Sequence, residues 1–244
     1  MDGLRLAVSW LSVLPVPAGE VNDRSSKQAI ALAPLVGALL GAAGALLLWG
    51  LSFTGAPPLL AGLLVVALLA LLTRGMHVDG LADTVDGLGC YGGPERALQV
   101  MRDGGTGPFA VVALIIAVGA QAVSIGALVQ QPWVLVLACA VGRAGFVLCC
   151  RAGVPAARPE GLGALVAGTQ PSWLVAAWWL VLMLAAFSLA GPQAFLGVLL
   201  AAALLNLFTR HVTHRFGGIN GDVLGAASEI GTTLVLIAAA LGLS

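Results

Sequence analysis

The sequence predicts an all-α protein: a polytopic membrane bundle of about seven transmembrane helices that forms one membrane-embedded domain over residues 1–244. Two observations predict this class. Apolar residues make up 59% of the chain and charged residues only 9%, a composition outside the range of soluble domains. Apolar runs also recur from residue 29 to residue 243 without a long polar stretch, so no separate soluble domain is expected.

Seven runs approach the roughly 20 residues that cross a bilayer as a helix. They cover residues 29–51, 58–72, 107–129, 133–150, 173–190, 193–208 and 223–243. The second and sixth runs are short, so we expect their ends to shift by several residues or their helices to tilt less.

The N-terminal segment, MDGLRLAVSWLSVLPVPAGE, has an apolar stretch after Arg5, as a signal peptide does. Asp2 precedes that arginine, however, and two prolines interrupt the stretch. We therefore expect an interfacial or re-entrant helix that ends at the PVP sequence.

The connections between the runs alternate between charged and uncharged. SFTGAP, QQP and AGPQ carry no charge, whereas the N-terminal segment and the connections 73–106, 151–172 and 209–222 hold ten of the eleven Lys and Arg residues. The positive-inside rule predicts that these four segments face the cytoplasm and that the C-terminus lies outside.

The eleventh basic residue, Arg143, falls inside the fourth apolar run. An unpaired charge there costs at least about 2.5–3.5 kcal/mol, so an intramembrane arginine is a candidate functional residue. A snorkelling or structurally paired arginine is the alternative.

Eight of the 22 charged residues lie between positions 74 and 103, and the HVDGLADTVDG motif carries three of them. Asp79, Asp83 and Asp86 stand at i, i+4 and i+7, which puts them within roughly 60° of arc on one helical face. Carboxylates so close repel one another unless a cation lies among them, and hard oxygen ligands suit Mg²⁺ or Mn²⁺. His77, one turn away or less, is a candidate for contacting phosphate or taking a proton.

The next motif, RDGGTGPF, lies where the third apolar run begins. Its glycines and Thr106 offer unpaired N–H groups at a helix N-terminus, where an anion binds favourably, and Arg102 is near. An ordinary glycine-rich helix start is the alternative.

A second polar cluster, RHVTHRFGGINGDVLGAASEI, lies at residues 210–230 on the same expected side. GGING indicates a turn, and Asp222 is the expected cap of the last span. Asp222 and Glu229 share a helical face, and Glu229 lies about two turns into the apolar region, which favours an internal partner or cavity. His214 and Arg215 are candidates for binding phosphate or form an ordinary basic flank.

Five motifs in this order carry a resemblance: LSVLPVP, LAPLVGALLGA, HVDGLADTVDGL, MRDGGTG and GGINGDVLGAASEI. Over nearly the whole chain they resemble the cobalamin synthase family of adenosylcobinamide-GDP ribazoletransferases. The family usually has a serine and a basic residue after the aspartate that matches Asp103, where this chain has Gly104 and Gly105. A contact made by those two side chains must therefore be replaced or absent here.

The resemblance implies a Mg²⁺-dependent transferase of the bacterial cytoplasmic (inner) membrane, with its active site facing the cytoplasm. It joins adenosylcobinamide-GDP to α-ribazole or its 5′-phosphate and releases GMP. The expected partners are these substrates and the lipid bilayer, with no nucleic acid, and a homo-oligomer is left open. The expected metal ligands are Asp79, Asp83 and Asp86, and Asp83 or His77 is the expected catalytic proton acceptor. The expected substrate-binding residues are Arg102, Asp103, Thr106, Arg143, His214, Arg215, Asn220, Asp222 and Glu229.

Two other functions remain open at this stage. A CDP-alcohol phosphotransferase also uses spaced aspartates at a membrane face, but DGLADT has Asp83 where that family places an arginine. A cation-coupled transporter needs an intramembrane relay, for which Asp83, Arg143 and Glu229 are candidates. Against the transporter, the carboxylates gather at one face, and the two halves show no inverted repeat.

Overall fold

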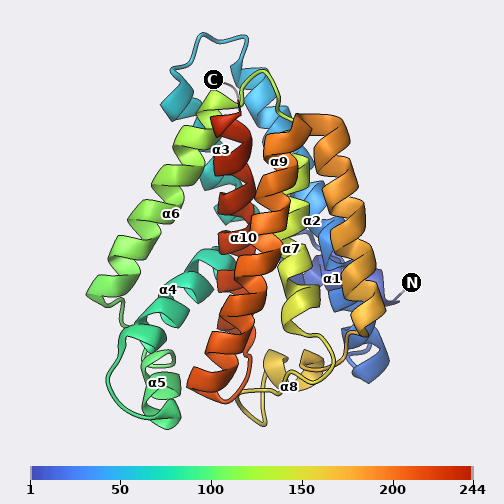
Figure 1. Ribbon diagram of the computed structural model, residues 1–244, viewed down its shortest axis with the longest axis vertical. Helices are drawn as coiled ribbons and strands as arrows, with labels where there is room; N and C mark the ends of the chain where they lie inside the picture. The colour runs from blue at the N-terminus through green and yellow to red at the C-terminus, as the bar shows by residue number, and fades with distance from the viewer. Residues whose placement is uncertain (1, 243–244) are drawn as a thin grey trace.

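The computed structural model describes residues 2–242, and the prediction of an all-α protein is confirmed (Figure 1). The helices are α1 (Asp2–Leu11), α2 (Asp23–Leu51), α3 (Pro58–Leu72), α4 (Met76–Gly89), α5 (Pro94–Val100), α6 (Pro108–Ala127), α7 (Val134–Cys149), α8 (Leu162–Val166), α9 (Ser172–Phe216) and α10 (Gly221–Leu241). These residues form no strand, and only two isolated bridges occur among them. Residues 243 and 244, the expected end of the last span and the expected external C-terminus, lie outside the described residues.

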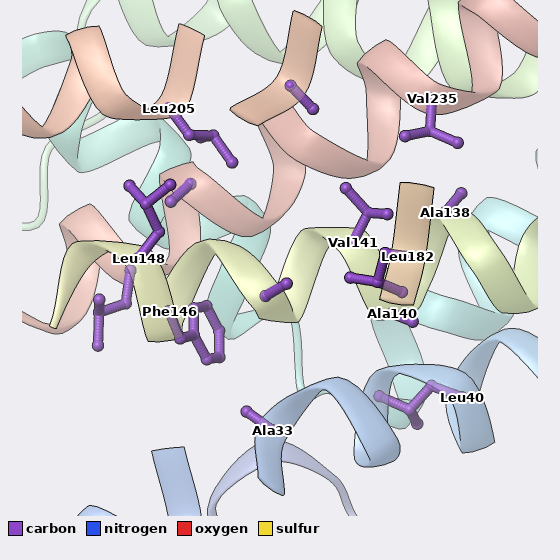
Figure 2. Close-up of a cluster of buried hydrophobic side chains, with 14 of the residues drawn as sticks. Ala33, Leu40, Ala138, Ala140, Val141, Phe146, Leu148, Leu182, Leu205 and Val235 are labelled. Carbon is purple, nitrogen blue, oxygen red and sulfur yellow. The ribbon is translucent and has the colours of Figure 1, made fainter. Parts of the chain in front are cut away.

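Helix α7 is the centre of the bundle, because nearly every residue along it is buried. It packs mainly against α2, α10 and α9. Figure 2 shows this core, with Ala138 and Val141 of α7 among Leu40 of α2, Leu205 of α9 and Val235 of α10. An apolar helix that is buried all round needs neighbours on every side, which fixes the surrounding helices.

Helix α9 is two helices joined at a sharp break. Gly191 has φ 80° and ψ −174°, a backbone conformation that glycine adopts without the strain a side chain would add, and Pro192 follows it. The orange ribbon turns back at this break, near the end of the bundle where α10 ends at Leu241 (Figure 1). Two separate apolar runs at 173–190 and 193–208 are thereby confirmed.

Four helices are long and apolar enough to cross a membrane: α2, α6, α9 and α10. The count becomes five if α3 and α4 form one bent span, and α7 is a shorter apolar helix. At about 1.5 Å per residue, an unbroken 45-residue α9 would be about twice as long as the hydrocarbon core is thick, so its break is consistent with two crossings. The chain is an integral membrane protein, and the number seven stays a prediction.

The chain bends by 91° between α3 and α4. Arg74 and Gly75 both adopt positive φ at this bend, 56° and 69°. The Arg74 guanidinium donates to the carbonyl oxygens of Ser9 (3.1 Å) and Ser12 (3.3 Å) and so ties α1 to the bend. Helix α4 therefore runs across the bundle, in the half of the molecule that also holds α5 and α8 (Figure 1).

The N-terminal helix differs from its expected extent. Helix α1 ends at Leu11, so the PVP sequence follows the helix at a distance instead of ending it. Leu6, Ala7 and Leu11 are buried, and α1 packs on α2. The protein itself thus covers part of the apolar stretch after Arg5, whereas Val13 and Leu14 are exposed.

Candidate active site

The site forms where α4 crosses the N-terminal end of α10, and two glycines allow the crossing. A Cβ added to Gly80 would lie 2.7 Å from the carbonyl oxygen of Asp222, and one added to Gly225 would lie 3.2 Å from the backbone of His77. A side chain at Gly80 would force the backbones apart, and one at Gly225 would fit only with a small shift, so the two backbones approach closely. The crossing brings the HVDGLADTVDG and GGINGDVLGAASEI motifs together.

Three carboxylates gather at this crossing, from Asp79, Asp83 and Asp222, and we call them the carboxylate site. Asp83 is partly buried and is repelled most by Asp222, then by Asp79, and less by Asp86. The structure therefore confirms that the two polar motifs meet, and the strongest charged neighbour of Asp83 comes from α10.

One cation offsets these carboxylates. Arg158 attracts both Asp83 and Asp222, and Arg102 lies close enough to repel it. Burial, then Arg102, lowers the pKa of the Arg158 guanidinium, while the two aspartates oppose the shift. An arginine remains charged despite such a shift, so the site holds a permanent cation beside the carboxylates.

Backbone pairing holds Arg158 in this place. Ala157 N–H donates to the Ile219 carbonyl (2.9 Å), and Ile219 N–H donates to the Pro155 carbonyl (3.0 Å), which joins the connection 151–172 to the start of α10. The Arg158 guanidinium also donates to the Leu98 carbonyl of α5 at 2.6 Å. Arg158 is not among the site residues predicted from the sequence, where it contributes only to the positive charge of the connection 151–172. Neither of the two connections alone carries a signal of this pairing.

The residue that caps the N-terminus of α10 differs from the predicted one. The sequence predicts Asp222 as the cap, but Asn220 is the N-cap, and its side-chain oxygen accepts from Val223 N–H at 3.0 Å. The Asn220 amide also donates to an Asp222 carboxylate oxygen at 2.8 Å. With the cap position filled by Asn220, the Asp222 carboxylate is available to the carboxylate site.

Asp86 has a different surrounding from the other two aspartates of α4. Its carboxylate accepts from Gly107 N–H (2.6 Å) and from Ala110 N–H (3.0 Å), so it caps the N-terminus of α6. The Gly107 N–H is one of the groups that the RDGGTGPF motif was expected to offer to a substrate anion, and Ala110 lies just after the motif. The anion at this helix N-terminus is instead the protein's own carboxylate.

The other residues of RDGGTGPF lie at the surface. Arg102, Asp103 and Thr106 are all exposed. Thr106 lines a shallow hollow with Asp79, and Arg102 lies near Arg158. Thr106 and Arg102, two of the three expected substrate-binding residues of this motif, thus border the carboxylate site.

His77 and Arg143 form a buried pair behind the carboxylate site. Arg143 is 3% exposed and its guanidinium lies 3.0 Å from His77 Nδ1. A guanidinium only donates, so Nδ1 accepts and the neutral imidazole carries its proton on Nε2. The His77 Nε2 atom is buried without a partner among the described residues.

Glu229 lies in a separate polar group, deeper in the bundle. The Gln121 amide donates to its carboxylate at 2.7 Å and to the Thr233 hydroxyl at 2.9 Å. Glu229 and Arg143 line the same small hollow and attract each other. The expected internal partner of Glu229 is present, and the structure does not bring this residue to the carboxylate site.

His214 and Arg215, at the end of α9, are also apart from that site. His214 is exposed. The Arg215 guanidinium donates to the carbonyl oxygens of Cys90 (2.7 Å) and Gly92 (3.0 Å), which fixes the connection between α4 and α5.

A cavity of about 230 Å³ opens beside the carboxylate site, and we call it the inner cavity. Asp79, Asp222 and His77 contribute to its wall, and the rest of the wall is mostly apolar. The site thus combines charged groups with an apolar recess, an arrangement typical of small-molecule sites.

The carboxylate site fits Mg²⁺ by its chemistry. Its metal-ligand atoms are hard carboxylate oxygens, and of its three carboxylates only that of Asp222 accepts from a side chain among the described residues. Within residues 2–242, no group of three or more Asp, Glu, His or Cys side chains is arranged so that it could hold a metal ion by itself. Such an open donor set suits Mg²⁺, which usually keeps waters and shares substrate phosphates.

Fold and site together define a class: a membrane-embedded enzyme whose carboxylates and cations gather at one end of a helical bundle. The chain belongs to the cobalamin-5-phosphate synthase family, whose family model matches residues 3–240. It is an enzyme, a transferase of cobalamin synthesis, and the confirmed family membership favours this function over a CDP-alcohol phosphotransferase or a transporter.

Curated relatives agree with the family. The adenosylcobinamide-GDP ribazoletransferase of Nocardioides sp. is 40% identical and covers 97% of each chain. That of Corynebacterium efficiens is 36% identical over 100% of this chain and 92% of its own. That of Bradyrhizobium diazoefficiens is 38% identical over 97% and 92%. No solved structure matches the chain.

Proposed function

We propose that the chain joins adenosylcobinamide-GDP to α-ribazole or its 5′-phosphate, with release of GMP, at the carboxylate site. The single observation that carries this proposal is the meeting of Asp79, Asp83 and Asp222 beside Arg158 at the crossing of α4 and α10. The names of the relatives supply the two substrates.

The charges of the site suit this reaction. A ribose hydroxyl of the nucleoside attacks the phosphate attached to the corrinoid, and GMP leaves with the electron pair of the broken P–O bond. Negative charge grows on the phosphates, so a fixed cation near them stabilises the transition state. Arg158, with exposed Arg102 near it, supplies that cation, and Asp83 accepts the proton of the attacking hydroxyl.

Asp79, Asp83 and Asp222 are the residues that would hold Mg²⁺. When bound, the ion neutralises the phosphate charge. In its absence three carboxylates would repel a diphosphate, so the same residues then hinder substrate binding. Asp86 was expected as a ligand from its spacing, and its contacts with α6 favour a structural role instead.

We propose that this site faces the cytoplasm at the inner membrane. Helices α4, α5 and α8 lie in the half of the bundle away from the Leu241 end of α10 (Figure 1). The connections at this end are the ones rich in Lys and Arg. Connections rich in Lys and Arg face the cytoplasm by the positive-inside rule.

The test is GMP release by the purified protein from adenosylcobinamide-GDP and α-ribazole, measured across a Mg²⁺ series. We expect release that requires both substrates and Mg²⁺. CMP release from a CDP-alcohol, or no nucleotide release with a folded protein, would contradict the proposal.

A further inference from the structure

The inner cavity has walls of one kind. It lies between α1, α2, α4, α7 and α10, and its apolar lining includes Trp10, Leu11, Ile30 and Phe146. Its volume of about 230 Å³ is below the roughly 300–1,000 Å³ of sites that enclose a whole drug-sized ligand. It therefore accepts a flat apolar fragment of a substrate and not a corrinoid ring.

This apolar recess contains one unused hydrogen-bond donor. His77 lines the cavity, its Nδ1 accepts from Arg143, and its Nε2–H has no partner within residues 2–242. A buried donor without a partner costs about 1–3 kcal/mol, so a ligand that supplies one acceptor atom gains from entering.

We propose that the inner cavity binds the base of the nucleoside substrate and that His77 Nε2–H donates to the free ring nitrogen of that base. This inference rests on the proposed function. The base of an α-ribazole is a benzimidazole, an apolar two-ring system in which one nitrogen carries the ribose and the other is a bare acceptor. One acceptor on an apolar ring matches one donor in an apolar cavity.

The guanine of the second substrate matches poorly. It carries several donors and acceptors, and the apolar walls formed by Trp10, Ile30 and Phe146 would leave most of them unpaired. The cavity thus discriminates between the two aromatic bases that reach this active site.

The position of the cavity also orients the reaction. Asp79 and Asp222 belong both to its wall and to the carboxylate site. A base held inside directs its ribose toward these carboxylates, where Asp83 takes the hydroxyl proton. His77 is then a substrate-binding donor, since Nε2 already carries a proton and Nδ1 is occupied by Arg143.

The experiment compares α-ribazole with its indole analogue, in which a C–H replaces the free ring nitrogen. For the wild-type protein we expect the KM for the nucleoside to rise about tenfold with the indole analogue, because one hydrogen bond is lost. In His77→Leu the two nucleosides should have equal KM values, and His77→Gln, which keeps an N–H donor, should restore part of the difference. The KM for adenosylcobinamide-GDP should not depend on the analogue. An equal tenfold ratio in wild type and His77→Leu would overturn the assignment.

A second variant avoids the His77–Arg143 pair, in case His77→Leu does not fold. Leu162 is a partly buried residue of the cavity wall on the short helix α8. Leu162→Trp narrows the cavity, so the KM for α-ribazole should rise at least about tenfold while the KM for adenosylcobinamide-GDP stays unchanged. A rise confined to adenosylcobinamide-GDP would show that the cavity holds the other substrate.

Equilibrium binding separates this proposal from the proposed function. We expect α-ribazole, without Mg²⁺ or the corrinoid substrate, to quench tryptophan fluorescence in wild type and much less in Trp10→Phe. Guanosine should not compete, and competition by guanosine equal to that of α-ribazole would contradict the assignment. Absence of GMP release by a protein that binds α-ribazole in this way would contradict only the proposed function.

Discussion

The first two turns of α4 and its last turn carry the same residue type on the same helical face, but their carboxylates have different surroundings. Asp79 and Asp83 lie with Asp222 at the carboxylate site, and no side chain among the described residues donates to either of them. Asp86 accepts two backbone N–H groups of α6 and is 9% exposed. One helix thus presents two carboxylates to a charged substrate site and uses a third to hold its neighbour.

This difference shows what spacing along one helix leaves undetermined. The i, i+4, i+7 pattern fixes the direction in which the three carboxylates point, but not what lies opposite each of them. The N-terminus of α6 approaches only the last turn. Its N–H groups carry partial positive charge, and a carboxylate satisfies them as well as a substrate anion would.

The largest effect is expected for Asp83→Asn. The change keeps the shape of the side chain but removes a charge that would bind Mg²⁺ and accept the proton, so GMP release should fall at least about 100-fold. Stability of the metal-free protein should be equal or slightly higher, because Asp222 and Asp79 lose a repelling neighbour. Turnover and thermal unfolding across a Mg²⁺ series measure both. Wild-type turnover at limiting Mg²⁺ would contradict the metal role.

Asp86→Ala should lower stability and leave the Mg²⁺ response unchanged, which is the reverse of the result expected for Asp83→Asn. It leaves Gly107 N–H and Ala110 N–H without their acceptor, so the free energy of unfolding should fall by about 2 kcal/mol. The Mg²⁺ concentration for half-maximal activity should stay near wild type in the protein that remains folded. Unchanged thermal stability with a weakened Mg²⁺ response would instead place Asp86 among the metal ligands, as its spacing predicts.

Much of the fold could be predicted from the sequence because hydrocarbon allows few alternatives. Apolar runs of bilayer length must be helices, so residues 58–72 match α3 at both ends, and the break at Gly191 follows from AGPQ. The site was harder to predict. The identity of the residue that caps α10 depends on two residues of register, and Asn220 is the cap instead of Asp222. Arg158 reaches the site through backbone pairing with Ile219, and pairing between distant connections has no signal in either segment alone.

Variants of Arg158 test whether its positive charge contributes to substrate binding at the carboxylate site. Arg158→Gln removes the cation that attracts Asp83 and Asp222, so the KM for adenosylcobinamide-GDP should rise about tenfold. Arg158→Lys, which keeps the charge, should recover part of the loss. Arg96→Gln is the matched control, because Arg96 is exposed and, among residues 2–242, its guanidinium donates only to Gln99. Equal KM values in Arg158→Gln and Arg96→Gln would remove Arg158 from the site.

The smallest effect on turnover is expected for Glu229→Gln, although the sequence groups this residue with Asp222. Glu229 receives the Gln121 amide and shares a hollow with Arg143, and it does not line the inner cavity. A glutamine keeps an oxygen for the Gln121 amide but no longer offsets the charge of Arg143. The expected result is a loss of about 1 kcal/mol in the free energy of unfolding, with turnover near that of wild type. Asp222→Asn, measured beside it, should lower turnover sharply because its carboxylate belongs to the carboxylate site. If Glu229→Gln lost turnover as severely as Asp222→Asn, the polar group around Arg143 would take part in the reaction, and the site would extend two helical turns further along α10.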